Sequence, residues 1–169
     1  MYRSKYFEYM NVYNNEGKYI GFIKDIALNY HKAMVIGFKI SSNSLFSKDK
    51  YILTKDIIAI NEKVIVKDFI KGDYLCFKDI KSMDIIDEYG SIIGVVEDFI
   101  MDIKDYSIKG IIVNPGIINR ILKGKEIILT KETILGNESI SYCGHRSKTK
   151  LISLAYNGLG DEVSEKDLG

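Results

Sequence analysis

The chain has 169 residues, of which 46% are hydrophobic and 28% are charged, and its formal net charge at pH 7 is +1. This balance is typical of a globular protein, and it excludes a disordered chain or one that relies on a strong overall charge to attract nucleic acid or anionic lipid. Two cysteines and two histidines cannot easily supply the four ligands of a tetrahedral zinc site, so we expect no metal and no other cofactor.

The first ten residues, MYRSKYFEYM, contain basic side chains but no apolar run, so they do not indicate a secretory signal. The longest uncharged stretches, GIIVNPGIIN and LISLAYNGLG, are ten residues long, whereas a transmembrane helix needs about 20. We therefore expect a cytoplasmic protein without a transmembrane segment.

The most informative feature of the sequence is an internal repeat. A shift of 73 residues places GKYIGFIKDI (17–26) on GSIIGVVEDF (90–99). Further along, the shift becomes 76, and YILTKDIIAINEKVIV (51–66) then lies over IILTKETILGNESISY (127–142). The chain therefore contains two copies of one small module, the second with three extra residues in a loop.

The repeat divides the chain into two domains and a tail. We predict a first domain at residues 1–75, a second at 76–146 and a C-terminal tail at 147–169. The tail ends in the acidic stretch GDEVSEKDLG, which we expect to be mobile.

In chain order, each module is predicted to begin with short strands joined by tight turns. Valine, isoleucine, tyrosine and phenylalanine dominate, and no long stretch keeps the apolar period of a helix. The first hairpin turns are YNNEGK and IDEYGS, in which Gly17 and Gly90 supply the positive φ of a tight turn. The second hairpin turns are LNYHKAM and MDIKDYS.

Each module is predicted to end with a short helical turn, after which the repeated NE leads into the final strand. Thr54 and Thr130, from the repeated ILTK, are placed to cap the turn. We expect Ile58 and Ile134, which follow it, to face the core.

Glycines inside the strands mark slips in the alternation of inward and outward side chains. The predicted inward positions are Ile20, Ile23, Ile26 and Leu28, matched by Ile93, Val96, Phe99 and Met101. In each copy, the inward residues switch between odd-numbered and even-numbered positions across one glycine. A glycine at such a switch predicts a β-bulge or sharp bend. The six glycines expected to have these structural roles in turns and bends are Gly17, Gly21, Gly37, Gly90, Gly94 and Gly110.

Bends at these glycines can curl a small sheet into a closed barrel, which removes exposed strand edges. The predicted fold is therefore all-β, with two tandem small β-barrels and a short C-terminal extension.

The repeated pattern resembles the PRC-barrel family over roughly residues 5–67 and 80–142. It consists of a turn glycine, "IG" four residues on, an apolar-x-D-apolar run, a hairpin, a strand with an interior glycine and a late D-I-x-x-I. The second copy departs from it at Thr133 and Gly136, in the late segment. The family includes part of the H subunit of the photosynthetic reaction centre, the C-terminus of a ribosome maturation factor and small stand-alone proteins. The resemblance implies binding and assembly modules with no shared catalytic residues.

Three surfaces are candidates for binding. The first is formed by Phe22 and Val95, apolar residues that the parity slip turns away from the barrel interiors. They either join the two barrels to each other or contact an outside partner.

The second candidate surface is the loop before the fourth strand of each module, SSNSLFSKDK (41–50) and NPGIINRILKGK (114–125). These loops carry apolar side chains followed by basic ones, and they either bind a partner or plug a barrel end. The candidate interaction residues in them are Leu45, Phe46, Ile117, Ile118, Arg120, Ile121 and Leu122.

The third candidate surface is HRSKTK (145–150), where Arg146, Lys148 and Lys150 lie close together in sequence. They are candidates for phosphate contact, and a solvated linker is the alternative.

No catalytic motif is present, and Asp25 and Asp98, one per module at equivalent places, are expected to form turn and bulge hydrogen bonds. We therefore expect a non-enzymatic adaptor that recognises a protein partner through its barrel-end loops and outward apolar residues. The alternatives are an RNA- or ribosome-associated factor and a small-molecule-binding or catalytic barrel. A homo-oligomer is also compatible with the sequence.

Overall fold

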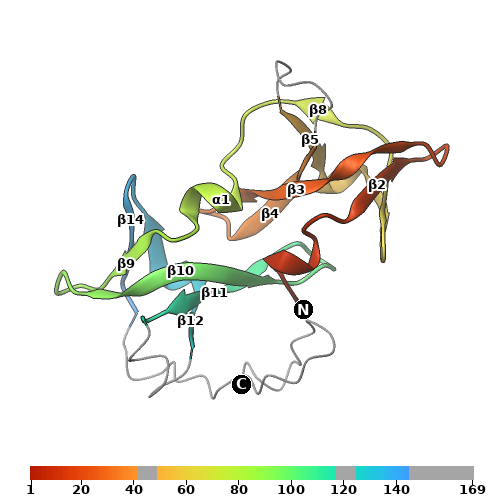
Figure 1. Cartoon of the computed structure of the whole chain (residues 1–169). Helices are drawn as coiled ribbons and strands as arrows, with labels where there is room; N and C mark the ends of the chain where they lie inside the picture. Colours follow the sequence, from red (N-terminus) through yellow and green to blue (C-terminus); the bar gives the residue numbers. More distant parts are fainter. Residues whose placement is uncertain (42–48, 117–124, 145–169) are drawn as a thin grey trace.

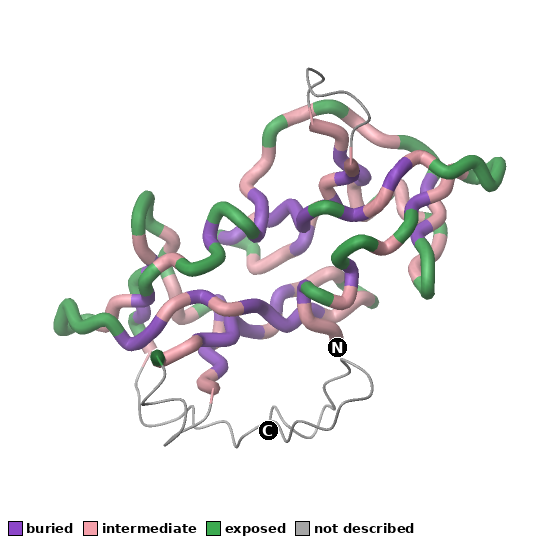
Figure 2. Tube along the Cα trace, viewed as in Figure 1, coloured by how far each residue is buried: buried purple, intermediate pink, exposed green. Residues whose placement is uncertain are grey.

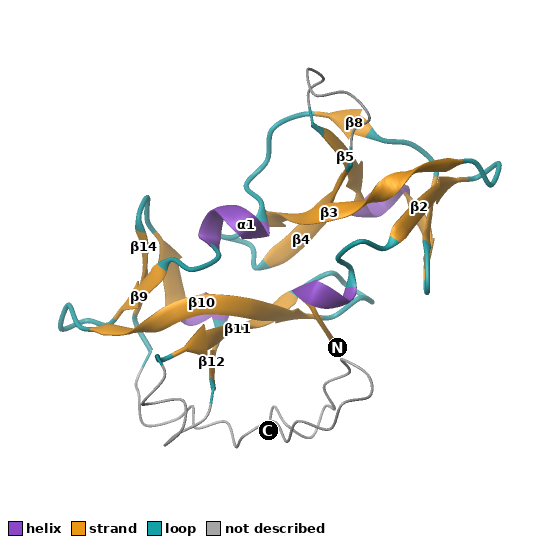
Figure 3. Ribbon diagram, in the orientation of Figure 1, coloured by secondary structure: helices purple, strands orange, loops and turns teal. Residues whose placement is uncertain are grey.

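The computed structural model describes residues 1–41, 49–116 and 125–144. The chain in these ranges is mostly β-strand, with short 3-10 turns and one short α-helix (Figure 3). The all-β prediction is confirmed. No helix among the described residues is long and apolar enough to cross a membrane.

The two modules form two sheets with the same strand order. The first sheet contains β2 (Asn11–Asn14), β3 (Tyr19–Asn29), β4 (Met34–Ile40), β5 (Lys50–Leu53), β6 (Ile57–Ile60) and β7 (Val64–Val66). The second contains β9 (Asp84–Ile86), β10 (Ile92–Met101), β11 (Ile108–Asn114), β12 (Glu126–Ile128), β13 (Thr133–Leu135) and β14 (Ser139–Tyr142). The orders are β6-β7-β2-β3-β4-β5 and β13-β14-β9-β10-β11-β12, so each strand has its counterpart in the other module (Figure 1).

Four further elements lie outside this common plan. They are β1 (Tyr2–Arg3), the 3-10 turn η1 (Ser4–Tyr6), β8 (Ile70–Lys71) and the helix α1 (Phe77–Ile80). The strand β8 extends the first sheet beyond β5, and β1 pairs with β10 of the second sheet.

The predicted turns and bulges are present in both copies. Gly17 and Gly90 both have φ +79, each in a turn closed by a backbone hydrogen bond from the glycine N–H. The register shifts at the start of β3 and of β10, where Ile20 and Ile93 are the extra residues. The inward residues predicted around these bulges are buried or packed against the core.

Gly37 has a steric role that the parity argument did not foresee. A Cβ at this position would lie 2.3 Å from the carbonyl oxygen of Ile52 in β5, which no side chain can tolerate. The neighbouring strand therefore approaches the backbone closely where β3 and β4 shift register, and only glycine allows this approach.

The sheets do not close into hydrogen-bonded rings, contrary to the expectation from the bends. In the described part of the chain, the strand path of each module is open between its first and last members. The 3-10 turn η2 (Thr54–Asp56) lies in the chain between β5 and β6, which stand at opposite ends of the common strand order. In the second module, η3 (Thr130–Glu132) lies between β12 and β13 in the same way.

Two details of the late segment were predicted wrongly. Thr54 and Thr130 are the first residues of their 3-10 turns, and neither turn has a side-chain capping bond at its N-terminus. Ile58 and Ile134 are 49% and 59% exposed rather than buried. The reason is register: Ile57 and Thr133 pair with buried Val66 and Tyr142, so the next residue of each strand faces outward.

The modules exchange their leading segments. The N-terminal strand β1 pairs with β10 of the second module, through Arg3 opposite Ile100. In the equivalent way, the segment before the second module pairs Cys76 with Ala27 of β3 in the first. Each module is thus preceded by a segment that pairs with the long strand of the other, through a short strand in one case and a single β-bridge in the other.

Two further contacts repeat this reciprocity at the second hairpin turns. The Val35 N–H donates to the Tyr106 carbonyl over 2.8 Å, and the Ile108 N–H donates to the Ala33 carbonyl over 2.7 Å. These four residues are equivalent in pairs under the 73-residue shift, so the modules are related by an approximate two-fold axis. Buried residues lie along the facing strands of both modules (Figure 2), and one hydrophobic core cluster contains residues of both.

Candidate functional site

The outer faces of the two sheets carry apolar side chains at equivalent places. We call Tyr19, Tyr13, Ile65 and Ile58 the first outer row, and Ile92, Ile86, Ser141 and Ile134 the second outer row. Each row crosses four strands at the far end of its module, away from the contact between modules (Figure 1).

The first outer row is built by cross-strand pairing. Tyr13 of β2 lies opposite Tyr19 of β3 and opposite Ile65 of β7. The two tyrosine rings meet edge to face, with centroids 5.6 Å apart, and the Lys63 ammonium lies 5.4 Å from the Tyr13 ring centroid. Ile58 continues the row on β6, where it is the extra residue of a bulge.

The second outer row has the same construction with aliphatic side chains. Ile86 of β9 lies opposite Ile92 of β10 and opposite Ser141 of β14. Ser141 in turn lies opposite Ile134 of β13. Serine here occupies the place of Ile65, so this strand position accepts a small polar side chain.

The ends of both rows are open to solvent. Tyr19 and Ile92 are 51% and 61% exposed, and the two isoleucines at the other ends are similarly exposed. Large apolar side chains that remain exposed at equivalent places in two copies, on strands rather than in turns, mark a contact surface more strongly than scattered ones do.

Phe22 and Val95 lie beside the rows, on the same faces. Phe22 is opposite the exposed Asn11, and Val95 is opposite the exposed Asp84. Both are half-buried, and the Phe22 ring lies 5.8 Å from that of Tyr9. The structure therefore brings these two candidates next to the outer rows.

The remaining sequence candidates lie outside the described residues. They are Leu45, Phe46, Ile117, Ile118, Arg120, Ile121, Leu122, Arg146, Lys148 and Lys150.

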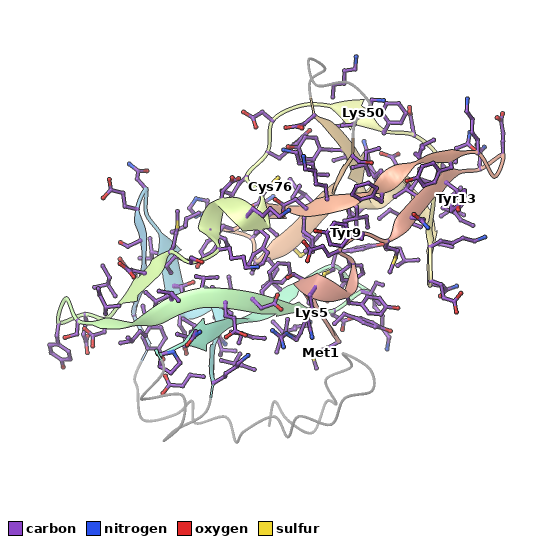
Figure 4. The ribbon with its side chains drawn as sticks, viewed as in Figure 1. Met1, Lys5, Tyr9, Tyr13, Lys50 and Cys76 are labelled. Carbon is purple, nitrogen blue, oxygen red and sulfur yellow. The ribbon has the colours of Figure 1, made fainter. Side chains whose placement is uncertain are left out.

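A second kind of site lies between the modules. It is a cleft with a volume of about 210 Å³, bordered by η1, α1 and a second bulge in each long strand, between Ile23 and Asp25 of β3 and between Val96 and Asp98 of β10. Five basic and four acidic side chains line it, among them Lys5 and Lys78, which are equivalent in the repeat. In Figure 4, Lys5 and Cys76 lie near the middle of the molecule, whereas Tyr13 lies toward the end of the first module.

The floor of this cleft contains Asp25 and Asp98, which are equivalent but differently paired. Asp98 accepts hydrogen bonds from the Phe99 N–H, from the N–H and the hydroxyl of Ser4, and from Arg3 Nε at 2.8 Å. Among the residues that the structure describes, Asp25 accepts only from the N–H groups of Ile26, at 2.8 Å, and Lys78, at 3.4 Å.

The difference follows from sequence, because Cys76 and Phe77 stand where Arg3 and Ser4 do. Burial raises the pKa of Asp25 above its ordinary value of 3.8, and the hydrogen bonds from Ile26 and Lys78 only partly oppose this. Within the described residues, no group of three or more histidine, cysteine or acidic side chains is arranged to hold a metal ion.

The family can now be decided. The family model described as "PRC-barrel domain" matches the chain twice, at residues 1–74 and 75–129. The chain belongs to the PRC-barrel family. No curated protein matches it.

The two PRC-barrel matches cover both modules but stop at Leu129 in the second. The unmatched part holds η3, β13 and β14, where Thr133 and Gly136 depart from the pattern of the first copy. The strand pairing of that part nevertheless follows the first module.

The sequence analysis missed the outer rows of these PRC-barrel modules. It found Phe22 and Val95, which lie beside the rows, but it assigned Ile58 and Ile134 to the core. Extending the same alternation backwards across the bulge would have identified Tyr19 and Ile92, because they directly precede the inward Ile20 and Ile93.

Proposed function

We propose that this protein is a non-enzymatic assembly module that binds protein partners through its outer rows. The observation that carries the proposal is the repetition of an exposed apolar row on the same face of both modules. An adaptor needs two contact surfaces, and the approximate two-fold relation of the modules provides one at each end.

The chemistry of the rows supports protein as the bound class. Aromatic and aliphatic side chains with a polar rim are typical of protein interfaces, in which a few buried anchors supply most of the binding energy. The family resemblance agrees with this, since it implies binding and assembly and carries over no catalytic residues. The barrel-end loops remain part of the proposed surface, although they lie outside the described residues.

The experiment is a capture from native lysate with tagged full-length protein, with and without ribonuclease. The test variant carries Tyr19→Ser, Ile58→Ser, Ile92→Ser and Ile134→Ser, and the matched control carries Tyr89→Ser. Tyr89 is 84% exposed but lies in a turn, outside the rows.

The proposal expects a protein partner that survives ribonuclease, is retained by the control and is lost by the four-site variant. A partner that the four-site variant retains in full would contradict the role of the rows.

The second candidate, an RNA- or ribosome-associated factor, is motivated by the basic cluster Arg146, Lys148 and Lys150. It expects captured ribosomal components to disappear on ribonuclease treatment. Binding to RNA would also weaken steeply with salt, and replacing the three basic residues by serine would reduce that salt dependence.

A further inference from the structure

We propose that the first outer row binds the second outer row of another copy of the same chain, so that copies associate head to tail. This inference rests on the proposed function and names one partner for it, a second copy. It follows from a difference between the modules that the repeat itself does not explain.

The strands and turns that carry the two rows have opposite charge. The segments of the first row, residues 11–23 and 55–67, contain four basic and three acidic side chains. The equivalent segments of the second row, residues 84–96 and 131–143, contain one basic and five acidic side chains. Three of the four row positions stay apolar, with Ser141 in the place of Ile65, while the net charge around them changes sign.

Comparison of equivalent positions locates this reversal beside the rows. Asp84, on the outer face of β9, replaces Asn11, and Ser139 replaces Lys63, whose ammonium lies over the Tyr13 ring. At the first turn, Asp87 and Glu88 replace two asparagines. The first row therefore has a basic rim and the second an acidic one.

The charges select which rows meet. Two second rows would bring acidic rims together, which costs free energy and slows encounter, and two first rows would lack the attraction between opposite charges. A first row against a second row pairs basic with acidic rims, and it places the two tyrosines against the isoleucines.

The geometry makes this contact heterologous, because the surfaces on the two copies differ. The β2–β3 and β9–β10 hairpins project from opposite ends of the molecule (Figure 1). Each copy can thus bind one neighbour at each end, and such a contact extends into open chains unless its rotation closes a ring. A row of about four side chains is small, so the contact is weak and reversible.

The test uses the full chain in sedimentation velocity over a range of concentrations. Wild type is expected to show concentration-dependent species larger than a dimer. Raising sodium chloride from about 50 mM to about 500 mM should weaken the association at least about tenfold, because the rims are exposed to screening.

Two variants, each with one outer row disrupted, distinguish contacts between unlike rows from other contacts. The first-row variant carries Tyr19→Ser and Ile58→Ser, and the second-row variant carries Ile92→Ser and Ile134→Ser. All four side chains are exposed, and Ser141 already occupies this kind of position, so both variants should fold. Circular dichroism and the melting temperature check this, and Tyr89→Ser is the control that should associate like wild type.

Each of these single-row variants alone should sediment as a monomer. A mixture of the two should form dimers of one copy of each and nothing larger, because one intact first row meets one intact second row. This mixing result is specific to unlike rows and would not arise from a symmetric contact.

A wild type that stays monomeric, a closed symmetric dimer, a mixture that does not dimerise or an association insensitive to salt would overturn the inference. The proposed function is tested by the lysate capture and not by sedimentation. It is contradicted only if the four-site variant keeps its captured partners. Copies that do not self-associate, combined with partners that depend on the rows, would leave the assembly module in place with a different partner.

Discussion

Asp25 and Asp98 show how equivalent residues in a repeat acquire opposite energetic roles. We predict that Asp98→Asn lowers the free energy of unfolding by about 2 kcal/mol, because it breaks the ion pair with Arg3 in a partly buried site. Asp25→Asn should instead raise the stability at neutral pH, by less than the loss at Asp98. It removes a buried carboxylate that no basic side chain pairs at ion-pair distance in the described part of the chain. Urea unfolding of both variants measures this.

The sign of the effect at Asp25 can be checked with pH. Because its pKa is raised in the folded protein, the native state holds this proton more tightly than the unfolded state does. Its contribution to stability is therefore lost as pH rises through the folded pKa. The advantage of Asp25→Asn should be present at pH 7 and should shrink as pH falls toward 3.8, the ordinary value. An advantage that does not change with pH would contradict the assignment.

Cys76 carries a second prediction, at alkaline pH. Burial raises the pKa of its thiol from 9.0 to about 11. Stability linked to this group is fully present below pH 9 and is lost as pH rises toward 11, by roughly 2–3 kcal/mol. Melting temperatures measured from neutral to alkaline pH should fall less steeply for Cys76→Ala than for wild type. The pKa of Tyr51 is also raised, first by burial and then by the Cys76 sulfur 3.7 Å from its hydroxyl, so Tyr51 adds a later fall that Cys76→Ala reduces but does not remove. Equal slopes for the two proteins would refute the role of the thiol.

At the scale of elements, the exchanged leading segments decide how the modules hold together. The Leu28 N–H donates to the Leu75 carbonyl over 2.8 Å, and Arg3 reaches Asp98, so each module depends on a segment that precedes the other. Each leading segment is also held to its own module, because the Phe7 and Phe77 rings lie against Phe38 of β4 and Phe99 of β10, with ring centroids 5.3 Å and 5.0 Å apart.

We predict that the chain divided into residues 1–74 and 75–169 reassembles as a one-to-one complex when both pieces are expressed together. The reciprocal strands and the continuous core supply the contact. A first piece that lacks residues 1–9 should bind the second at least about tenfold more weakly, because β1 and the Arg3–Asp98 pair are lost. Co-purification and isothermal titration measure both. Equal affinity of the shortened piece would show that the leading segment does not join the modules.

At the scale of the whole molecule, the sequence predicts the plan of each module better than the relation between them. The repeat aligned every strand of the two sheets, because turn glycines and bulges are local requirements of the backbone. Ile58 and Ile134 were misplaced because one residue of register decides the face, and register after a 3-10 turn depends on pairing with Val66 and Tyr142.

The exchange of leading segments could not be predicted from the residues. The pairing of Arg3 with Ile100 uses backbone groups, which every residue except proline offers equally. The residue types therefore do not show whether the leading strand pairs with its own module or with the other one. The cleft between the modules was missed for the same reason, since its lining comes from η1, α1 and two bulges that meet only through that exchange.

The exchange also sets an order of events during synthesis. Arg3 must find a partner 95 residues further along the chain, so the first nine residues leave the ribosome long before β10 exists. Contacts of such sequence separation form late and slow the completion of folding. Until then, the leading segment of one nascent chain is free to pair with β10 of a finished neighbour. The same strands that hold the two modules together can therefore pair between two chains when neighbouring ribosomes translate one mRNA.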